Sequence, residues 1–106
     1  MTMSKIGVCL PSYNEAKNIC PLIQKLLKLD LNILICLVDD NSPDDTYKIV
    51  KRKFKTEINK KIFLILRKNK NGRGSAVWEG IDFLKKKKAN IKIFVEMDCD
   101  FSHSVE

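Results

Sequence analysis

The sequence predicts an α/β protein with a parallel, doubly wound sheet that carries helices on both of its faces. Four short apolar runs alternate with three stretches of helical periodicity, and short loops join them. The second run, NILICLV, is apolar throughout, as expected of a parallel strand covered on both faces. The chain has 106 residues, of which 44% are hydrophobic, and this predicts one globular domain.

The predicted strands cover residues 5–10, 32–38, 61–66 and 91–97. Proline lacks the N–H that an interior ladder position uses, so Pro11 is expected to end the first strand. The first helix is predicted over residues 15–29, where one face carries Ile19, Leu22, Ile23, Leu26 and Leu27.

The second helix is expected to start at Ser42, which can cap it, with Pro43 in its first turn, and to continue to Phe54. Residues 72–74 (GRG) are expected to form a turn. The third helix should then run from Ser75 to about residue 87, with its inward side chains at Val77, Ile81 and Leu84.

The net charge is +7, from 20 Lys and Arg against 13 Asp and Glu, which favours anionic partners. Basic residues concentrate in 48–61 and 85–88, whereas acidic residues cluster in 39–45 and 96–100. The acidic clusters lie where a ligand is expected to bind, and a nucleic-acid-binding protein rarely places carboxylates there. Nucleic acid is therefore not expected as a partner. The lysine runs are expected to be solvated helix faces, with attraction to a membrane surface or to phosphate as the alternative.

The four cysteines, at positions 9, 20, 36 and 99, show no CxxC spacing, and the one histidine is His103, so zinc is not expected. Cys9 and Cys36 lie in apolar runs and are expected to be buried free thiols, as in a reducing compartment. There is no signal-peptide pattern and no apolar run of about 20 residues. The segment is therefore expected to be soluble or peripheral to a membrane.

Polar, mostly acidic residues follow each predicted strand. These segments are 11–15 (PSYNE), 39–46 (DDNSPDDT), Arg67 with 72–76 (GRGSA), and 98–103 (DCDFSH). Ligands of doubly wound sheets bind beyond the carboxyl ends of the strands, so the four segments are predicted to form one site.

Asp98 and Asp100 are two residues apart, and an extended chain directs both to the same side. Two such carboxylates repel each other unless they share a cation, and Mg²⁺ or Mn²⁺ prefers oxygen ligands and bridges to substrate phosphates. The alternative for this spacing is a pair of solvated loop aspartates or a helix cap. Its place after a buried strand favours the metal site.

Asp39 and Asp40 leave two roles open, because one can cap the following turn and the other can accept hydrogen bonds from a ribose or base. Tyr13 can stack on a base and Glu15 can accept from it, or both can serve the helix entry. The GRG turn matches neither the P-loop nor the dinucleotide fingerprint, although it can bring backbone N–H groups to a phosphate.

Together these motifs resemble the inverting glycosyltransferase family 2 of GT-A fold, and more closely its dolichol-phosphate (polyprenol-phosphate) mannosyltransferase branch. The resemblance spans essentially the whole chain and rests chiefly on DDNSPDDT and MDCDFSH, whereas PSYNE is general to the wider family. Two residues depart from the pattern: Cys99, where alanine is usual, and Arg73, where leucine is common. Neither departure removes a charge needed at the metal.

The resemblance implies a Rossmann-like nucleotide-diphospho-sugar transferase fold and an enzyme that transfers mannose from GDP-mannose to dolichyl (polyprenyl) phosphate. The product, dolichyl phosphate mannose, serves protein glycosylation or GPI-anchor synthesis. The implied nucleotide-sugar neighbours are Pro11, Tyr13, Glu15, Val38 and Asp40, together with the metal segment. The implied catalytic metal ligands for Mg²⁺ or Mn²⁺ are Asp98 and Asp100, with the Cys99 backbone nearby and Ser102 as a third ligand.

The resemblance also implies inversion at the anomeric carbon without a strong general base, because the acceptor phosphate is already nucleophilic. Since family members run well beyond the DxD motif, residues 1–106 are expected to be the nucleotide-sugar-binding part, truncated after the fourth strand and inactive alone. The acceptor part would come from a missing C-terminal segment, and a membrane-anchoring subunit is a further expected partner. The expected location is the cytosolic face of the endoplasmic reticulum membrane in a eukaryote, or the cytoplasm at the membrane in a prokaryote.

Three alternatives remain open. The first is another family 2 or polyprenyl-phosphate glycosyltransferase, for example one with a UDP-glucose donor. The second is a haloacid-dehalogenase-like phosphohydrolase with Asp98 as nucleophile and Asp100 as acid. The third is a non-catalytic basic module that binds nucleic acid or acidic membrane.

Overall fold

The computed structural model describes residues 5–13, 16–29, 32–40, 45–68, 73–87 and 91–97. Within them the elements follow the predicted order: β1 (Lys5–Ser12), α1 (Ala16–Lys28), β2 (Ile33–Asp39), α2 (Thr46–Lys53), β3 (Ile62–Leu66), α3 (Arg73–Lys87) and β4 (Ile91–Glu96). The strands form one parallel sheet in the order β3-β2-β1-β4. The predicted parallel α/β sheet is confirmed.

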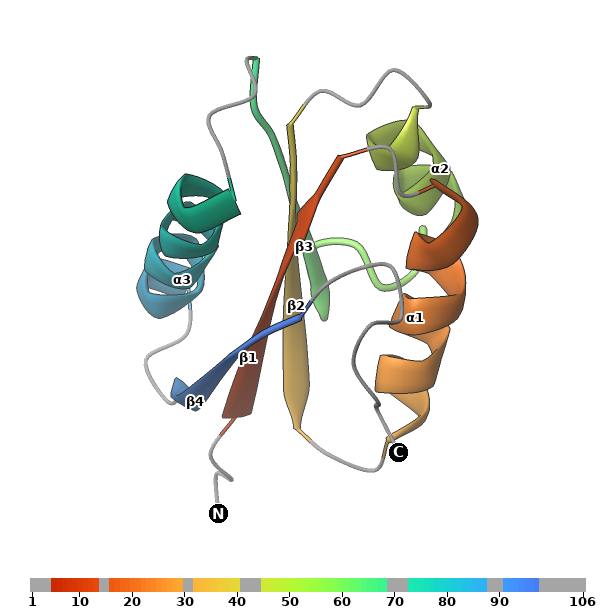
Figure 1. Cartoon of the computed structure of the whole chain (residues 1–106). Coiled ribbons are helices and arrows are strands. Elements are labelled where there is room, and N and C mark those ends of the chain that lie inside the picture. The colour runs from red at the N-terminus through yellow and green to blue at the C-terminus, as the bar shows by residue number, and fades with distance from the viewer. Residues whose placement is uncertain are drawn as a thin grey trace.

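Helices α1 and α2 cover one face of the sheet and α3 covers the other (Figure 1). Strand side chains alternate between two hydrophobic cores, as a period of two requires. Val8 and Leu10 join the core under α1 and α2, whereas Cys9 joins the core under α3. The continuously apolar strand sequences are explained by this double burial.

The order of the strands fixes where a ligand can bind. The chain steps outward from β1 to β2 and β3, and α3 then carries it back to the other side of β1, where β4 pairs. The switch in direction therefore lies between β1 and β4, whose ends are joined by a hydrogen bond from Met97 N–H to the Cys9 carbonyl (3.2 Å). A crevice beyond the carboxyl ends at such a switch point is the usual ligand site of these sheets.

The prediction that Pro11 ends the first strand is wrong, because β1 continues to Ser12 and Pro11 lies opposite Val38. The Ser12 carbonyl accepts from Asp40 N–H on the β2 side (3.1 Å), whereas the Cys9 carbonyl accepts on the β4 side. Pro11 is two residues after Cys9, so its backbone is directed to the same side, toward β4. The last residue pair with β4 is Cys9–Glu96, and Pro11 lies beyond it. No ladder hydrogen bond is lost there, so proline is tolerated.

The second helix begins at Thr46, so the predicted start at Ser42 is wrong. Asp45 precedes the helix with φ 61°, a left-handed conformation, and makes no side-chain cap. Asp45 thus occupies the N-cap position, and Ser42 and Pro43 lie outside the described residues. The helix also stops before Phe54, whose side chain still packs in the core at 5% exposure.

The third helix begins at Arg73, so the second half of the predicted GRG turn is helical. Of its predicted inward side chains, Leu84 is fully buried, whereas Val77 and Ile81 are partly buried. Helix α3 comes close to the sheet at Gly80, where an added Cβ would lie 3.3 Å from both Cys9 Sγ and Val38 Cγ2. A glycine at this position lets α3 pack directly over β1 and β2.

Candidate functional site

The carboxyl edge of the sheet brings three of the predicted segments together. Backbone hydrogen bonds lock their ends: Asp40 N–H donates to the Ser12 carbonyl (3.1 Å), and Arg67 N–H donates to the Asp39 carbonyl (2.8 Å). The segments that follow β1, β2 and β3 therefore converge, as the sequence predicts. The fourth segment, from Asp98 onward, lies outside the described residues.

The adjacent aspartates of this edge have different partners, as expected where a strand sends successive side chains to opposite faces. Asp39 is 1% exposed and accepts a hydrogen bond from Ser12 Oγ (2.9 Å). This bond ties β2 to β1 inside the molecule. Asp40 instead pairs with Arg67, the residue directly after β3, so the two aspartates are engaged by different neighbouring strands.

Asp40 and Arg67 form a buried, two-pronged ion pair, with residue exposures of 6% and 7%. Arg67 Nε donates to Asp40 Oδ1, and Arg67 Nη2 donates to Asp40 Oδ2 at 2.9 Å. The hydrogen bond to Asp40 raises the pKa of the Arg67 guanidinium, although its burial works in the opposite direction. Such fork geometry fixes the plane of the carboxylate.

The same guanidinium also reaches α3. Arg67 Nη1 donates to Ser75 Oγ (2.9 Å) and lies 3.5 Å from Glu79 Oε1. Arg67 thus links the end of β3 to the carboxylate after β2 and to the first turns of α3. Arg67, which is positioned by contacts at the ends of β2 and β3 and in α3, therefore holds Asp40 in one orientation.

Sequence reasoning assigned no role to Arg67. The available signal was the position of Arg67 directly after the third apolar run, in a segment that also carries Lys68, Lys70 and Arg73. Its partner Asp40 is 27 residues away along the chain. No periodicity within either segment indicates that pairing.

The other described residues of the predicted nucleotide site have distinct exposures. Tyr13 is 38% exposed at the end of β1, so its ring is accessible from solvent. Val38 is 1% exposed and packs under α3 near Gly80. A ligand can therefore be bordered by Val38 only through its main chain. Pro11 is half-buried, and Glu15 lies outside the described residues.

The predicted metal ligands Asp98, Asp100 and Ser102, and the neighbouring Cys99, also lie outside the described residues. Within the part of the chain that the structure describes, no group of three His, Cys, Asp or Glu side chains is arranged to hold a metal ion. Asp39 and Asp40 are engaged by Ser12 and Arg67.

Cys9 and Cys36 are buried free thiols, as predicted. Burial raises the pKa of Cys9 to about 11 and that of Cys36 to about 12. A thiol that stays protonated at neutral pH is a poor nucleophile, so both belong to the core. Among the described helices, none is both long and apolar enough to cross a membrane.

The fold is shared with solved GT-A glycosyltransferases. The structure is similar to that of the mannosyltransferase PcManGT from Pyrobaculum calidifontis in complex with GDP-Man and Mn²⁺, with a TM-score of 0.75 and 22% identity. The similarity covers 93% of this chain and 28% of that one. Residues 7–106 match the family Glycosyl transferase family 2, and the chain belongs to that family.

Two curated relatives support this assignment. The chain is 34% identical to the dolichol-phosphate mannosyltransferase of Pyrococcus furiosus, over 96% of this chain and 27% of the relative. It is 29% identical to the polyprenol monophosphomannose synthase of Mycolicibacterium smegmatis, over 93% of this chain and 36% of the relative. The chain thus spans about a quarter to a third of the length of these relatives. The resemblance read from the motifs is confirmed, and the family favours glycosyl transfer over phosphate hydrolysis.

Proposed function

We propose that this chain forms the donor-binding part of a glycosyltransferase that moves mannose from GDP-mannose to dolichyl (polyprenyl) phosphate. The observation that carries the proposal is the convergence of three strand ends on Asp40, which Arg67 orients, beside the strand that leads into the DCD segment. The names of the Pyrococcus and Mycolicibacterium relatives support mannose and a polyprenyl acceptor. The GDP-Man and Mn²⁺ of the Pyrobaculum structure support the donor and the metal.

The described residues suit the nucleoside of the donor. A carboxylate offers about four acceptor positions, and Arg67 occupies two of those of Asp40. The remaining positions can accept N–H groups of the base or O–H groups of the ribose. Tyr13 lies at the end of the neighbouring strand with an accessible ring that suits stacking. Pro11, Glu15 and the main chain of Val38 complete the proposed nucleotide contacts.

The DCD segment suits the diphosphate. We assign Asp98 and Asp100 as ligands of Mg²⁺ or Mn²⁺, with Ser102 as a third oxygen donor and the Cys99 main chain alongside. When bound, the ion neutralises negative charge on the departing diphosphate. The acceptor phosphate is itself an anionic nucleophile, so the chain needs only to orient the donor for attack from the opposite side of the anomeric carbon. That geometry inverts the sugar configuration.

The acceptor lipid places the proposed reaction at a membrane. We propose that acceptor contacts come from a C-terminal segment or from a membrane-anchoring subunit, and that nucleic acid is not a partner. The proposed location is the cytosolic face of the endoplasmic reticulum membrane in a eukaryote, or the cytoplasmic membrane surface in a prokaryote. A second candidate donor is UDP-glucose, because the described contacts do not select the base.

A thermal-unfolding comparison tests the donor directly. GDP-mannose, GDP and UDP-glucose are each added with and without Mn²⁺. We expect GDP-mannose and GDP with Mn²⁺ to raise the Tm most, because a ligand at 100 times its Kd stabilises the fold by about 2.7 kcal/mol. A larger rise in Tm with UDP-glucose than with GDP-mannose would contradict the guanine nucleotide and support a UDP-sugar donor. An acyl-phosphate trapped on Asp98 would instead support the phosphohydrolase.

A further inference from the structure

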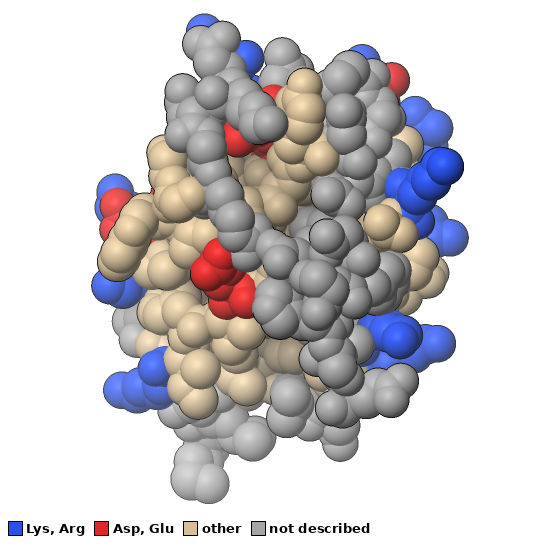
Figure 2. Space-filling model, viewed as in Figure 1, with Lys and Arg blue, Asp and Glu red and all other residues tan. Residues whose placement is uncertain are grey.

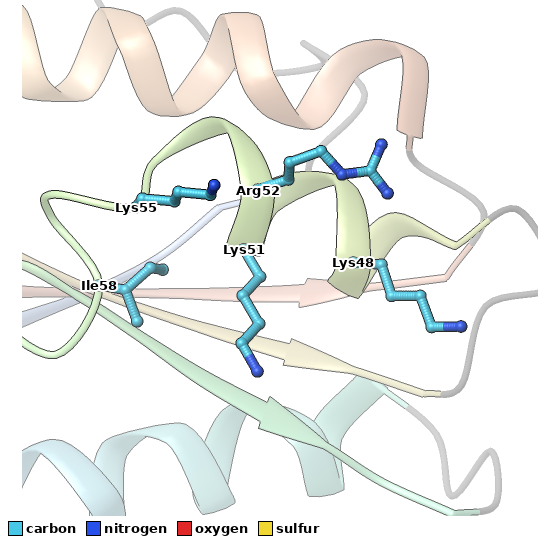
Figure 3. A pocket seen from close by; sticks show the side chains of 5 residues that line it. All are labelled: Lys48, Lys51, Arg52, Lys55 and Ile58. Atoms are coloured by element: carbon cyan, nitrogen blue, oxygen red, sulfur yellow. The ribbon is translucent and has the colours of Figure 1, made fainter.

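Helix α2 and the turn that follows it carry a basic hollow, which we call the α2 hollow. Its lining residues are Lys48, Lys51, Arg52, Lys55 and Ile58, and its volume is about 560 Å³. Figure 3 shows the basic side chains spread along α2, with Ile58 at one end and Lys48 at the end nearest the arrowheads of the strands. The hollow therefore extends toward the carboxyl edge that carries the candidate site.

The charged residues that line the hollow are all basic. Lys48, Lys51, Arg52 and Lys55 recur at helical spacing, and residues 46–56 contain no Asp or Glu. Among the described residues, no carboxylate forms an ion pair with any of these four side chains. Figure 2 shows that blue side chains gather at the right-hand edge of the molecule, on the side of α1 and α2.

Helix stability accounts for only part of this arrangement. Like charges three or four residues apart destabilise a helix, and Lys48 lies in the first turn of α2, where the helix dipole also disfavours a cation. Lys51 and Arg52 lie in the last turn of α2, as Lys85, Lys86 and Lys87 do in α3, and the dipole favours cations at both places. Lys85 and Lys87 also lie over the rings of Phe94 and Phe83, at 5.9 and 5.5 Å.

We propose that the α2 hollow is a docking surface for the anionic headgroups of a lipid bilayer. The inference rests on the proposed function, because a polyprenyl phosphate acceptor resides in a membrane. Several phosphates side by side supply the negative charge that the row of cations lacks, and the aliphatic stems with Ile58 suit the interfacial layer. Docking along α2 would hold the donor edge close to the membrane that contains the acceptor.

Vesicle co-sedimentation of the 106-residue chain tests the docking surface. Phosphatidylcholine vesicles with and without phosphatidylserine are compared at increasing salt. We expect binding only to the anionic vesicles, weakening with salt, since a basic residue near such a surface strengthens partitioning roughly fivefold. The triple variant Lys48→Glu, Lys51→Glu, Lys55→Glu should therefore bind at least about 100-fold more weakly.

The matched control is Lys85→Glu, Lys86→Glu, Lys87→Glu, which changes the net charge equally on the other side of the sheet. It should retain binding within a few-fold. Equal loss in both variants would show that net charge alone acts and would overturn the docking surface. If the glutamate variant of α2 does not fold by circular dichroism, the corresponding glutamine variants of both sets give the same comparison.

Two further measurements distinguish a lipid surface from other anionic ligands. Inorganic phosphate that competes fully at equal phosphate concentration, or duplex DNA bound more tightly than anionic vesicles, would overturn a lipid surface. GDP affinity with Mn²⁺ is measured on the same variants and should be unchanged. A wild-type chain that binds GDP but does not bind anionic vesicles would refute this inference alone. A wild-type chain that does not bind GDP would refute the proposed function.

Discussion

Replacing Arg67 with methionine is expected to lower the free energy of unfolding by about 3–5 kcal/mol, the usual cost of removing one partner of a buried ion pair. The substitution leaves the Asp40 carboxylate at 6% exposure without its cation. It also removes the hydrogen bond that links β3 to Ser75 of α3. Urea unfolding at neutral pH measures this loss.

The same variant should weaken binding of GDP in the presence of Mn²⁺, because Asp40 is no longer held in one orientation. Arg67→Lys keeps the charge but loses the fork that contacts both carboxylate oxygens, so its stability should fall between the wild type and Arg67→Met. Adding Asp40→Leu to Arg67→Met should recover much of the stability, since no buried charge is then left unpaired. A loss below about 1 kcal/mol in Arg67→Met, typical of exposed pairs, would contradict the buried clamp.

Asp98→Ala is expected to abolish the part of GDP affinity that depends on a divalent ion. We expect Mn²⁺-dependent affinity to fall by at least about 100-fold, the upper end of what loss of a metal's outer-shell partner costs. Binding without metal should change little, because the substitution leaves Tyr13 and Asp40, the proposed nucleoside contacts, in place. Calorimetric titration of GDP with Mn²⁺, and with EDTA in its place, separates the two parts.

The charge-matched control for this variant is Asp82→Ala, which removes an exposed carboxylate from α3. Its GDP affinity should equal that of the wild type with and without Mn²⁺. If Asp98→Ala also binds like the wild type, the DxD segment holds no metal that the nucleotide needs. A basic module that binds anions through its lysines would then explain the affinity better.

Much of the fold could be predicted because its two central strands, β1 and β2, are buried on both faces, although the edge strand β4 is largely exposed. Apolar runs located every strand, and the helix between each pair of successive strands implied parallel pairing. The predicted start of α2 was wrong although Ser42 and Pro43 form a typical helix-start pattern. The helix begins later, after Asp45, which has a left-handed conformation. The predicted end of β1 was wrong because the sequence does not show whether the sheet needs a hydrogen-bond donor at residue 11. Only the pairing of neighbouring strands shows that proline is tolerated there.

The site was predictable to the level of strand ends and no further. Acidic residues after apolar runs identified Asp40 and the edge it occupies, since parallel strands end together. The partner Arg67 requires the contact between β2 and β3, which is set by tertiary packing rather than by local pattern. The inaccessibility of the Val38 side chain likewise depends on Gly80 of α3.

Calorimetric titration of GDP into the wild-type chain, with and without Mn²⁺, tests the central claim most directly. The donor-binding account predicts one site per chain and an affinity at least about tenfold higher with Mn²⁺, a difference of about 1.4 kcal/mol. Equal affinity in the two titrations, or no GDP binding in either, would contradict it.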